Sequence, residues 1–488
     1  MNAARSDDAI VIGGGTSGLV AAAYLAKAGK KVLLLEARDK LGGLCAPSNL
    51  SEGLSSAIGV HTLYALDPLV VRELKLPKNG LRFASRELAL TGLRREGKHI
   101  VISRDMHDTA SSIALHSQRD AETWPLFRKE LFELARAMRP LWWEACGAFP
   151  TGIEGQRIER VARMGAGAWL DSWFESEALK ATLCFDSTAG GTSVLEPGSA
   201  LSLIWRAAQE MSGLQGAVAI PRGGPVALVE ALTSAARGAG CELRTSSQVG
   251  RVILDGGRVA GVQMQSGETC FAPLVFSAIS LHAFSPLLPP AALGVAHMEA
   301  SGRISPLAEA RVVMILRKLP QIAGDTTLAA GRFILAERSE TYAAAEMAAR
   351  NRGVADELPI EFVTSAAADA SRARPDQHVL SALVRPVPQH PAEGWPALSA
   401  KLAACVVASI ERLASGFSRD ISHIEILNPA NTQAISTLTV SRMLMPIASR
   451  IKAPIDGLFF CGADAEPVPA VSGRAARIAT ALAMAVQR

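Results

Sequence analysis

The chain lacks the cysteine pattern of a disulfide or zinc framework, although it contains seven cysteines among 488 residues. The cysteines are widely scattered, and no two of them form a C-x-x-C pair. This usage is typical of a reducing compartment and argues against structural zinc. We therefore expect a cytoplasmic protein without a metal site.

Long apolar runs are also missing. No stretch of roughly 18 apolar residues occurs, so no segment is expected to cross a bilayer as a helix. The first residues, Met1 to Asp8, are polar and predict no apolar signal region. Mean hydropathy is nevertheless high, at +0.21, which leaves room for peripheral contact with a membrane or for a greasy pocket.

Basic residues form no stripe along the sequence. Lysine and arginine number 50 and the acids 46, which gives a net charge of only +4. Nucleic-acid-binding proteins concentrate their basic residues, so we exclude a nucleic-acid partner. The apolar fraction of 49% predicts a large buried core, and the length predicts two or three domains.

What the sequence does contain is a strand–helix–strand pattern at its start. Ala9–Ile12 is a short apolar run typical of a buried strand. Residues 19–28 then predict a helix that ends at Gly29, and Val32–Leu35 predicts a second strand. Together these segments predict a βαβ unit of a parallel sheet.

A glycine motif, G-x-G-x-x-G, joins the first strand to the helix and reads Gly13-Gly14-Gly15-Thr16-Ser17-Gly18. Gly13 permits a tight turn, Gly15 lets the backbone approach a pyrophosphate, and Gly18 lets the helix pack on the strand. The helix N-terminus, at Thr16 and Ser17, would face the phosphates with free N–H groups. The motif predicts a dinucleotide site but does not separate NAD from FAD.

An acidic residue, Glu36, ends the second strand, where its carboxylate would accept hydrogen bonds from ribose hydroxyls. It begins the run Glu36-Ala37-Arg38-Asp39-Lys40-Leu41-Gly42-Gly43. This E-x-R-x-x-x-G-G run resembles the second signature of FAD-containing amine oxidases and phytoene desaturases. The resemblance implies FAD as the cofactor. It also implies that Ala37, Arg38, Gly42, Gly43 and Leu44 lie against the cofactor.

Further segments narrow the resemblance to phytoene-dehydrogenase-related flavoproteins of bacteria. They are residues 59–62, 66–68, 72–74, 170–177, 197–200 and 221–224. In this superfamily the strand that holds Val249 presents its backbone to the adenine. An ordinary position in a sheet is an equal alternative for Val249.

A third signature lies near the C-terminus, in residues 457–464 and at Ser472-Gly473. The resemblance implies that Gly462, Asp464, Val471 and Ser472 approach the ribityl phosphate and the flavin ring. A helix that begins near Ser472 would offer N–H groups to the ring. The chain departs from the family twice, with Val468-Pro469-Ala470 in place of a glycine cluster and Ser436-Thr437-Leu438-Thr439 in place of a Gly-Gly-Asn or Gly-Gly-His stretch.

The pattern along the chain predicts an α/β fold with two domains. Strand and glycine signals occupy residues 1–70, 215–285 and 452–488, which we assign to a discontinuous, Rossmann-like FAD-binding domain. Residues 71–214 and 286–451 are assigned to a second α+β domain that holds the substrate. Tryptophans and helical spacing gather in the first of these two stretches.

Catalytic candidates are few, because FAD itself accepts the hydride and the protein has only to position the substrate and exclude water. His61 is the one candidate base, with a hydrogen-bonded structural role as the alternative. Cys45 is expected to be a buried filler. The pair Trp142-Trp143 favours core packing over a substrate channel.

We predict an FAD-dependent oxidoreductase that removes hydride from a C–H bond of a small apolar substrate, isoprenoid or carotenoid-like, as a desaturase or dehydrogenase. The electron acceptor, oxygen or a quinone, stays open. One alternative is an amine or alcohol oxidase on the same scaffold, and another is a flavin-binding scaffold or assembly partner with weak redox activity. The main reading predicts an extended apolar pocket that ends at the flavin, whereas several acids in the pocket would favour an amine.

Overall fold

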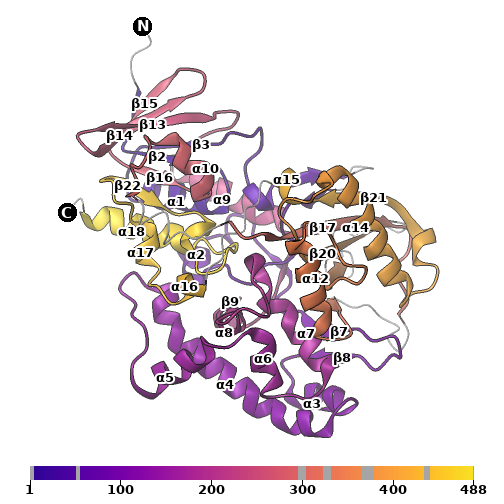
Figure 1. Cartoon of the computed structure of the whole chain (residues 1–488). Helices are drawn as coiled ribbons and strands as arrows, with labels where there is room; N and C mark the ends of the chain where they lie inside the picture. The colour runs from indigo at the N-terminus through magenta and orange to yellow at the C-terminus, as the bar shows by residue number, and fades with distance from the viewer. Residues whose placement is uncertain are drawn as a thin grey trace.

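The computed structural model describes residues 5–50, 55–294, 304–322, 331–364, 369, 377–432 and 440–486, and Figure 1 shows its arrangement. A five-stranded parallel sheet of order β12-β3-β2-β16-β22 forms one part of it. Its strands are β2 (Ala9–Ile12), β3 (Val32–Leu35), β12 (Glu242–Arg244), β16 (Val275–Ser277) and β22 (Leu458–Phe460). The predicted strands are confirmed, and three separated pieces of the chain build the one sheet.

Both faces of this sheet are buried, because the short strands β2 and β3 are apolar at every position. Val11 and Leu34 face three helices, which are α1 (Thr16–Lys27), α9 (Val226–Gly238) and α18 (Arg474–Val486). Ile10 and Leu33 point to the other face. A second small sheet covers that face with β1 (Arg5–Ser6), β13 (Val249–Asp255), β14 (Arg258–Met264) and β15 (Thr269–Phe271).

A seven-stranded mixed sheet of order β21-β17-β20-β19-β18-β7-β8 forms the other large layer. Its strands are β7 (Ala89–Gly92), β8 (Ile100–Ile102), β17 (Leu307–Leu316), β18 (Gly331–Leu335), β19 (Ile360–Thr364), β20 (His378–Pro388) and β21 (Ile421–Leu427). Helices α12 (Glu340–Arg350) and α14 (Gly394–Glu411) pack on it through a common apolar core. Figure 1 places this sheet beside the parallel sheet.

Helices form the third region, drawn in magenta below both sheets in Figure 1. They are α3 (Met106–Ala114), α4 (Gln118–Trp143), α5 (Gly152–Val161), α6 (Ala166–Asp171), α7 (Glu177–Ser187) and α8 (Ala200–Ala208). Trp142 is fully buried here and donates its indole N–H to the carbonyl of Met443 at 2.7 Å. Trp143 packs against the guanidinium of Arg474. The core-packing interpretation of the two tryptophans is therefore confirmed.

Short elements connect these regions. The helices are α2 (Pro68–Glu73), α10 (Leu281–Phe284), α15 (Pro429–Thr432), α16 (Val440–Met443) and α17 (Ala448–Ile451). The strands are β4 (Pro47–Asn49), β5 (Ser55–Ala57), β6 (Phe83–Ser85), β9 (Glu210–Met211), β10 (Leu214–Gln215) and β11 (Ile220–Pro221). The α/β class with a second sheet-containing domain is confirmed, and the numbered domain borders stay a prediction. Across the described ranges, no helix combines the length and apolar character of a membrane span.

Candidate active site

A cavity of about 510 Å³ extends from the carboxyl ends of β2 and β3 to the seven-stranded sheet and to α7 and α8. Ligands of open α/β sheets bind outside the carboxyl ends of the strands. The volume lies within the range of roughly 300–1,000 Å³ that is typical of ligand and cofactor sites. The residues that line this cavity define the candidate site, and its two ends differ in chemistry.

The first turn of α1 forms one end of the cavity. Gly13, Gly15, Thr16 and Ser17 all line it. No side chain caps the helix at Gly15, and the first N–H groups of a helix have no acceptor within the helix. Gly18 does not line the cavity. A Cβ at Gly18 would stand 1.9 Å from the carbonyl oxygen of Gly13, so this glycine allows the helix to pack against the turn.

The paired glycines lie directly against this turn. The N–H of Gly42 donates to the carbonyl of Gly14 at 2.8 Å. A Cβ on Gly43 would stand 3.0 Å from the Cα of Gly15. Gly43 and Leu44 line the cavity, whereas Gly42 supports them from outside it. The two glycine motifs thus form one cradle of bare backbone, which fits the pyrophosphate and ribityl chain of FAD.

Glu36 holds the turn together from the end of β3. Its carboxylate accepts hydrogen bonds from the N–H groups of Gly14 at 2.6 Å and Arg38 at 2.9 Å. Glu36 and Arg38 line the cavity, and each Glu36 oxygen has a second lone pair for a ribose hydroxyl. Ala37 is exposed and Val249 is buried in β13, and neither lines the cavity.

The C-terminal signature reaches the cavity through Asp464 and Val471. Asp464 accepts a hydrogen bond from the N–H of Leu281 at 2.7 Å. Gly462 does not line the cavity. It packs against the backbone of β16's end, where a Cβ would stand 2.9 Å from the carbonyl oxygen of Ala278. The buried hydroxyl of Ser472 donates to the carboxylate of Glu466, and so it faces away from the cavity.

The structure therefore divides the predicted site residues into two sets. The set that lines the cavity is Gly13, Gly15, Thr16, Ser17, Glu36, Arg38, Gly43, Leu44, His61, Asp464 and Val471. The set outside the lining is Gly18, Ala37, Gly42, Val249, Gly462 and Ser472. Their individual roles toward FAD stay predictions. The divergent Pro469-Ala470 also lines the cavity, and residues 436–439 lie outside the described residues.

His61 lies at the other end of the cavity, in a loop whose residues 59–65 all line it. Its Nε2 is 2.9 Å from Oε1 of Glu361, and its Nδ1 is 3.2 Å from Oγ of Ser381. Ser381 Oγ accepts a hydrogen bond from Nη2 of Arg311 at 2.6 Å, so its own hydrogen is available for Nδ1. Burial lowers the pKa of His61. Both ring nitrogens are therefore engaged, and a neutral imidazole that donates from Nε2 to Glu361 satisfies both contacts.

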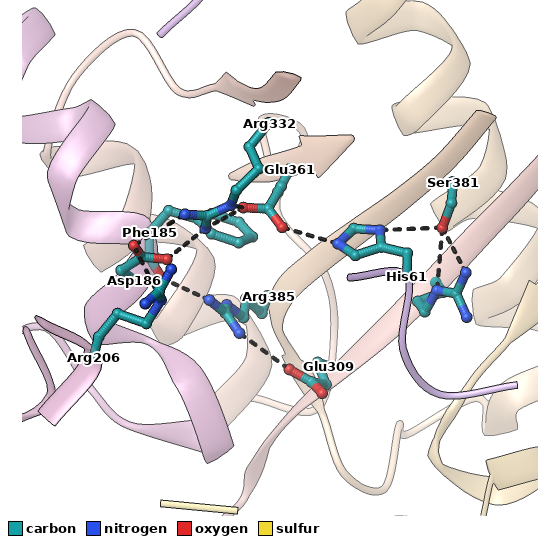
Figure 2. Close-up of polar contacts among 10 residues, drawn as sticks. His61, Phe185, Asp186, Arg206, Glu309, Arg332, Glu361, Ser381 and Arg385 are labelled. Carbon is teal, nitrogen blue, oxygen red and sulfur yellow. Dashed lines mark hydrogen bonds and ion pairs between the residues drawn. The ribbon is translucent and has the colours of Figure 1, made fainter. Parts of the chain in front are cut away.

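Around His61 stands a buried network of charged side chains, drawn in Figure 2. Arg332 lies between two carboxylates, with Nη2 at 2.5 Å from Oδ1 of Asp186 and Nε at 2.7 Å from Oε2 of Glu361. The guanidinium of Arg332 holds the pKa of both carboxyls below the usual range despite their burial. Arg206 of α8 approaches Asp186 at 3.7 Å, and Arg385 of β20 contacts Glu309 of β17 at 3.3 Å.

The sequence predicts an apolar pocket and gives no direct indication of this charged network. Mean hydropathy averages over the whole chain and says nothing about one wall of a cavity. A usable signal was nevertheless present in β17, where Glu309 and Arg311 interrupt an otherwise apolar strand two positions apart. Such spacing places both side chains on one face. Charged side chains are buried only where other groups pair with them.

The chain is similar in sequence to known flavoproteins of one family. The model of the family described as flavin containing amine oxidoreductase matches residues 16–304. Pyridine nucleotide-disulfide oxidoreductase domain-containing protein 2 of Rattus norvegicus is 28% identical over 96% of this chain and 92% of its own. Hydroxyneurosporene desaturase of Cereibacter sphaeroides is 29% identical over 53% of each chain.

A solved structure shares the whole fold. Putrescine oxidase, wild type bound to putrescine, superposes with a TM-score of 0.68 over 99% of this chain and all of its own, at 15% identity. At that identity the likeness concerns the fold alone. It places the parallel sheet and the seven-stranded sheet in a known architecture.

Proposed function

This chain belongs to the family of flavin-containing amine oxidoreductases, and from that premise we propose that it removes a hydride from a C–H bond of an organic substrate bound in its 510 Å³ cavity. It is an FAD-dependent oxidoreductase. One observation carries the proposal. The bare helix N-terminus at Gly15 and the buried network around His61 line the same cavity, so that cofactor and substrate would meet inside it.

The protein's share of the reaction is positioning. Bound FAD supplies an acceptor for hydride. The first turn of α1 would hold its pyrophosphate, Glu36 its ribose, and Asp464 with Val471 the part nearest the ring. The loop of residues 59–65 and strands β17 and β20 line the cavity, and they would hold the substrate against the cofactor.

The reaction balances as a dehydrogenation. A hydride leaves one atom of the substrate, a proton leaves its neighbour to solvent, and a double bond forms between them. FAD, when bound, would accept the hydride, and oxygen or a quinone would be the final acceptor of the two electrons. For the substrate we propose an extended apolar body of the isoprenoid or carotenoid-like kind, supported by the similarity to a hydroxyneurosporene desaturase.

Amine or alcohol oxidation is the second candidate, because acids do line the cavity and the fold is that of putrescine oxidase. A cationic amine needs a carboxylate free to receive it. Asp186, Glu309 and Glu361 each already contact an arginine. The dehydrogenation of an apolar body is therefore the better-supported proposal.

The test begins with purified protein. Denaturation should release FAD into the supernatant, since the cofactor is expected to be noncovalently bound. The folded protein is then mixed anaerobically with isoprenoid alcohols and acids, carotenoids and primary amines, and the visible flavin band is followed. Bleaching by an isoprenoid compound supports the proposal, and bleaching by amines alone transfers it to the second candidate. A flavin that only a chemical reductant bleaches would leave a binding scaffold as the function.

A further inference from the structure

The inner end of the cavity carries more positive than negative charge. Four arginines line it, and they face three carboxylates. The arginines are Arg206, Arg311, Arg332 and Arg385, and the acids are Asp186, Glu309 and Glu361. Burial disfavours the charged form of His61 by lowering its pKa. The lining of this end therefore contains one more arginine than carboxylate.

Two of the four arginines have their hydrogen-bonding needs met by the protein. Arg332 is held between Asp186 and Glu361. Arg311 donates to the hydroxyls of Ser56 and Ser381 and to the carbonyl of Ala57. These contacts fix both guanidinium groups against the wall of the cavity.

The other two arginines retain unused donors. Nη1 of Arg206 and Nε of Arg385 are buried and have no hydrogen-bond partner within the described part of the chain. The side chains of Arg206 and Arg385 are 8% and 9% exposed. The link from Arg206 to Asp186, at 3.7 Å, is too long for a hydrogen bond. Buried donors of this kind are ordinarily satisfied by a ligand, water or ion.

The two side chains converge on the same part of the cavity. Arg206 stacks on the ring of Tyr64, with its Cζ 4.7 Å from the centroid. Arg385 stacks on Phe185 at 4.3 Å and donates to the carbonyl of that residue, which precedes Asp186. Figure 2 shows the Arg206 guanidinium beside Asp186 and the Arg385 guanidinium between Asp186 and Glu309. They form a donor site with two arms, one from each guanidinium group.

Unused, buried arginine donors suit an anion, and a carboxylate accepts hydrogen bonds from arginine in a planar, bidentate manner. Apolar surface adjoins the site. A second cavity of about 160 Å³ shares Asp186, Arg206 and Arg332 with the first, and Trp124, Phe127 and Leu203 line it. A ligand bound here would be charged at one point and apolar beside it.

We infer that the substrate carries a carboxylate, bound by the guanidinium groups of Arg206 and Arg385, next to an apolar body. The inference rests on the proposed function, because it names the class of compound whose C–H bond is oxidised. It distinguishes this chain from an oxidase of amines and from a desaturase of plain hydrocarbons, neither of which brings a negative charge.

Three compounds of equal chain length test it on the FAD-loaded enzyme: octanoate, octanamide and octylamine. Binding is measured by calorimetry, which reports affinity whether or not a compound is oxidised. We expect octanoate to bind at least about tenfold more tightly than the neutral amide and the cationic amine, a difference of one charge-assisted contact. Tighter binding of octylamine, or equal binding of all three, would overturn the inference.

Variants then locate the site. Arg206→Gln and Arg385→Gln should each weaken octanoate binding about tenfold to a hundredfold and leave octanamide binding little changed. Arg206→Lys should recover part of the loss because it restores the charge. Arg338→Gln, at an exposed ion pair, is the matched control and should bind as the wild type does. Unaltered octanoate affinity in both glutamine variants would contradict the assignment of these arginines.

FAD content and circular dichroism are recorded for every variant. If a glutamine variant does not fold, the comparison of the three compounds on the wild type decides alone. The proposed function fails if the protein holds FAD and binds octanoate but no substrate bleaches its flavin. The inference fails if the protein oxidises a substrate and binds the carboxylate no better than the amide or the amine.

Discussion

Nε2 of His61 lies 2.9 Å from Oε1 of Glu361, and both side chains are buried. The ring is held at its other nitrogen by Ser381. A histidine placed in this way orders the loop of residues 59–65 against the seven-stranded sheet. Because both ring nitrogens have a partner, we interpret His61 as a positioning residue and not as a base.

The first prediction concerns the pH dependence of stability. Burial is the largest cause that lowers the pKa of His61 in the folded chain, whereas an unfolded histidine titrates near about 6.5. Below that pH the unfolded chain binds a proton that the folded chain does not, so the free energy of unfolding falls as the pH drops. The slope contributed by this one residue reaches at most about 1.4 kcal/mol per pH unit.

The measurement is chemical denaturation at several values between about pH 7 and pH 5, above the range where unfolded carboxyls titrate. His61→Gln, which can still donate to Glu361, should show a flatter profile than the wild type. His107→Gln, at an exposed position, is the control and should retain the wild-type slope. Identical slopes in all three proteins would show that His61 is not held neutral.

The second prediction concerns Glu36. Glu36→Ala should reduce FAD affinity about tenfold to a hundredfold, because a charge-assisted hydrogen bond to ribose contributes roughly 1.5–3 kcal/mol. It also leaves the N–H groups of Gly14 and Arg38 without their carboxylate, so the turn itself should loosen. Glu36→Gln keeps one acceptor and should lose less. Fluorescence titration of the apoprotein with FAD measures both, and equal affinity in Glu36→Ala and wild type would rule out the ribose contact.

Much of this half of the site could be predicted because its logic is local. Strand, tight turn, helix and acid follow one another within a short stretch, so that the order Gly13, Gly15, Gly18 and Glu36 already implies a geometry. The sequence could not show which residues of each motif line the cavity. Gly462 and Ser472 belong to a matching signature, yet they pack against neighbouring backbone and Glu466 instead of lining the cavity.

The charged network could not be predicted, since it depends on the pairing of strands that lie far apart in the sequence. Arg332 meets Glu361 only because β18 and β19 pair antiparallel, with Ile334 opposite Glu361. Arg206 and Asp186 join them from α8 and α7. A single charged residue in an apolar segment does not indicate which residue will be its partner. The partner depends on the register of the strands, which is a property of the folded sheet.

The third prediction separates two glycines of one motif. A Cβ on Gly15 would stand 3.7 Å from the Cα of Gly43, an ordinary contact, and it would enter the cradle proposed for the pyrophosphate. Gly15→Ala should therefore fold with little change in unfolding midpoint and lose FAD affinity on the order of tenfold or more. Gly18→Ala places its Cβ 1.9 Å from the carbonyl oxygen of Gly13 and should lose stability instead, by about 1–3 kcal/mol.

Both glycine variants are compared as apoproteins and as FAD-loaded proteins in thermal unfolding. The expected pattern is a normal apoprotein midpoint for Gly15→Ala with a much smaller rise on adding FAD than the wild type shows. A full rise for Gly15→Ala would mean that the cofactor does not approach this backbone. An undisturbed apoprotein midpoint for Gly18→Ala would contradict the packing seen at the turn.

The fourth prediction concerns Arg332, whose guanidinium joins Asp186 to Glu361. Removing one partner of a buried ionic group leaves the other charges uncompensated, at a cost of about 3–5 kcal/mol, whereas replacing the whole group is often close to neutral. Arg332→Leu should therefore lower the free energy of unfolding strongly. The double variant that adds Glu361→Gln should recover much of the loss, since it removes the carboxylate that has lost its arginine, while Asp186 keeps Arg206 as a neighbour at 3.7 Å. Arg338→Leu, at an ion pair whose partners are both more than 60% exposed, should leave the denaturation midpoint unchanged. If the double variant were no more stable than Arg332→Leu, the loss would come from missing packing and not from the unpaired carboxylate of Glu361.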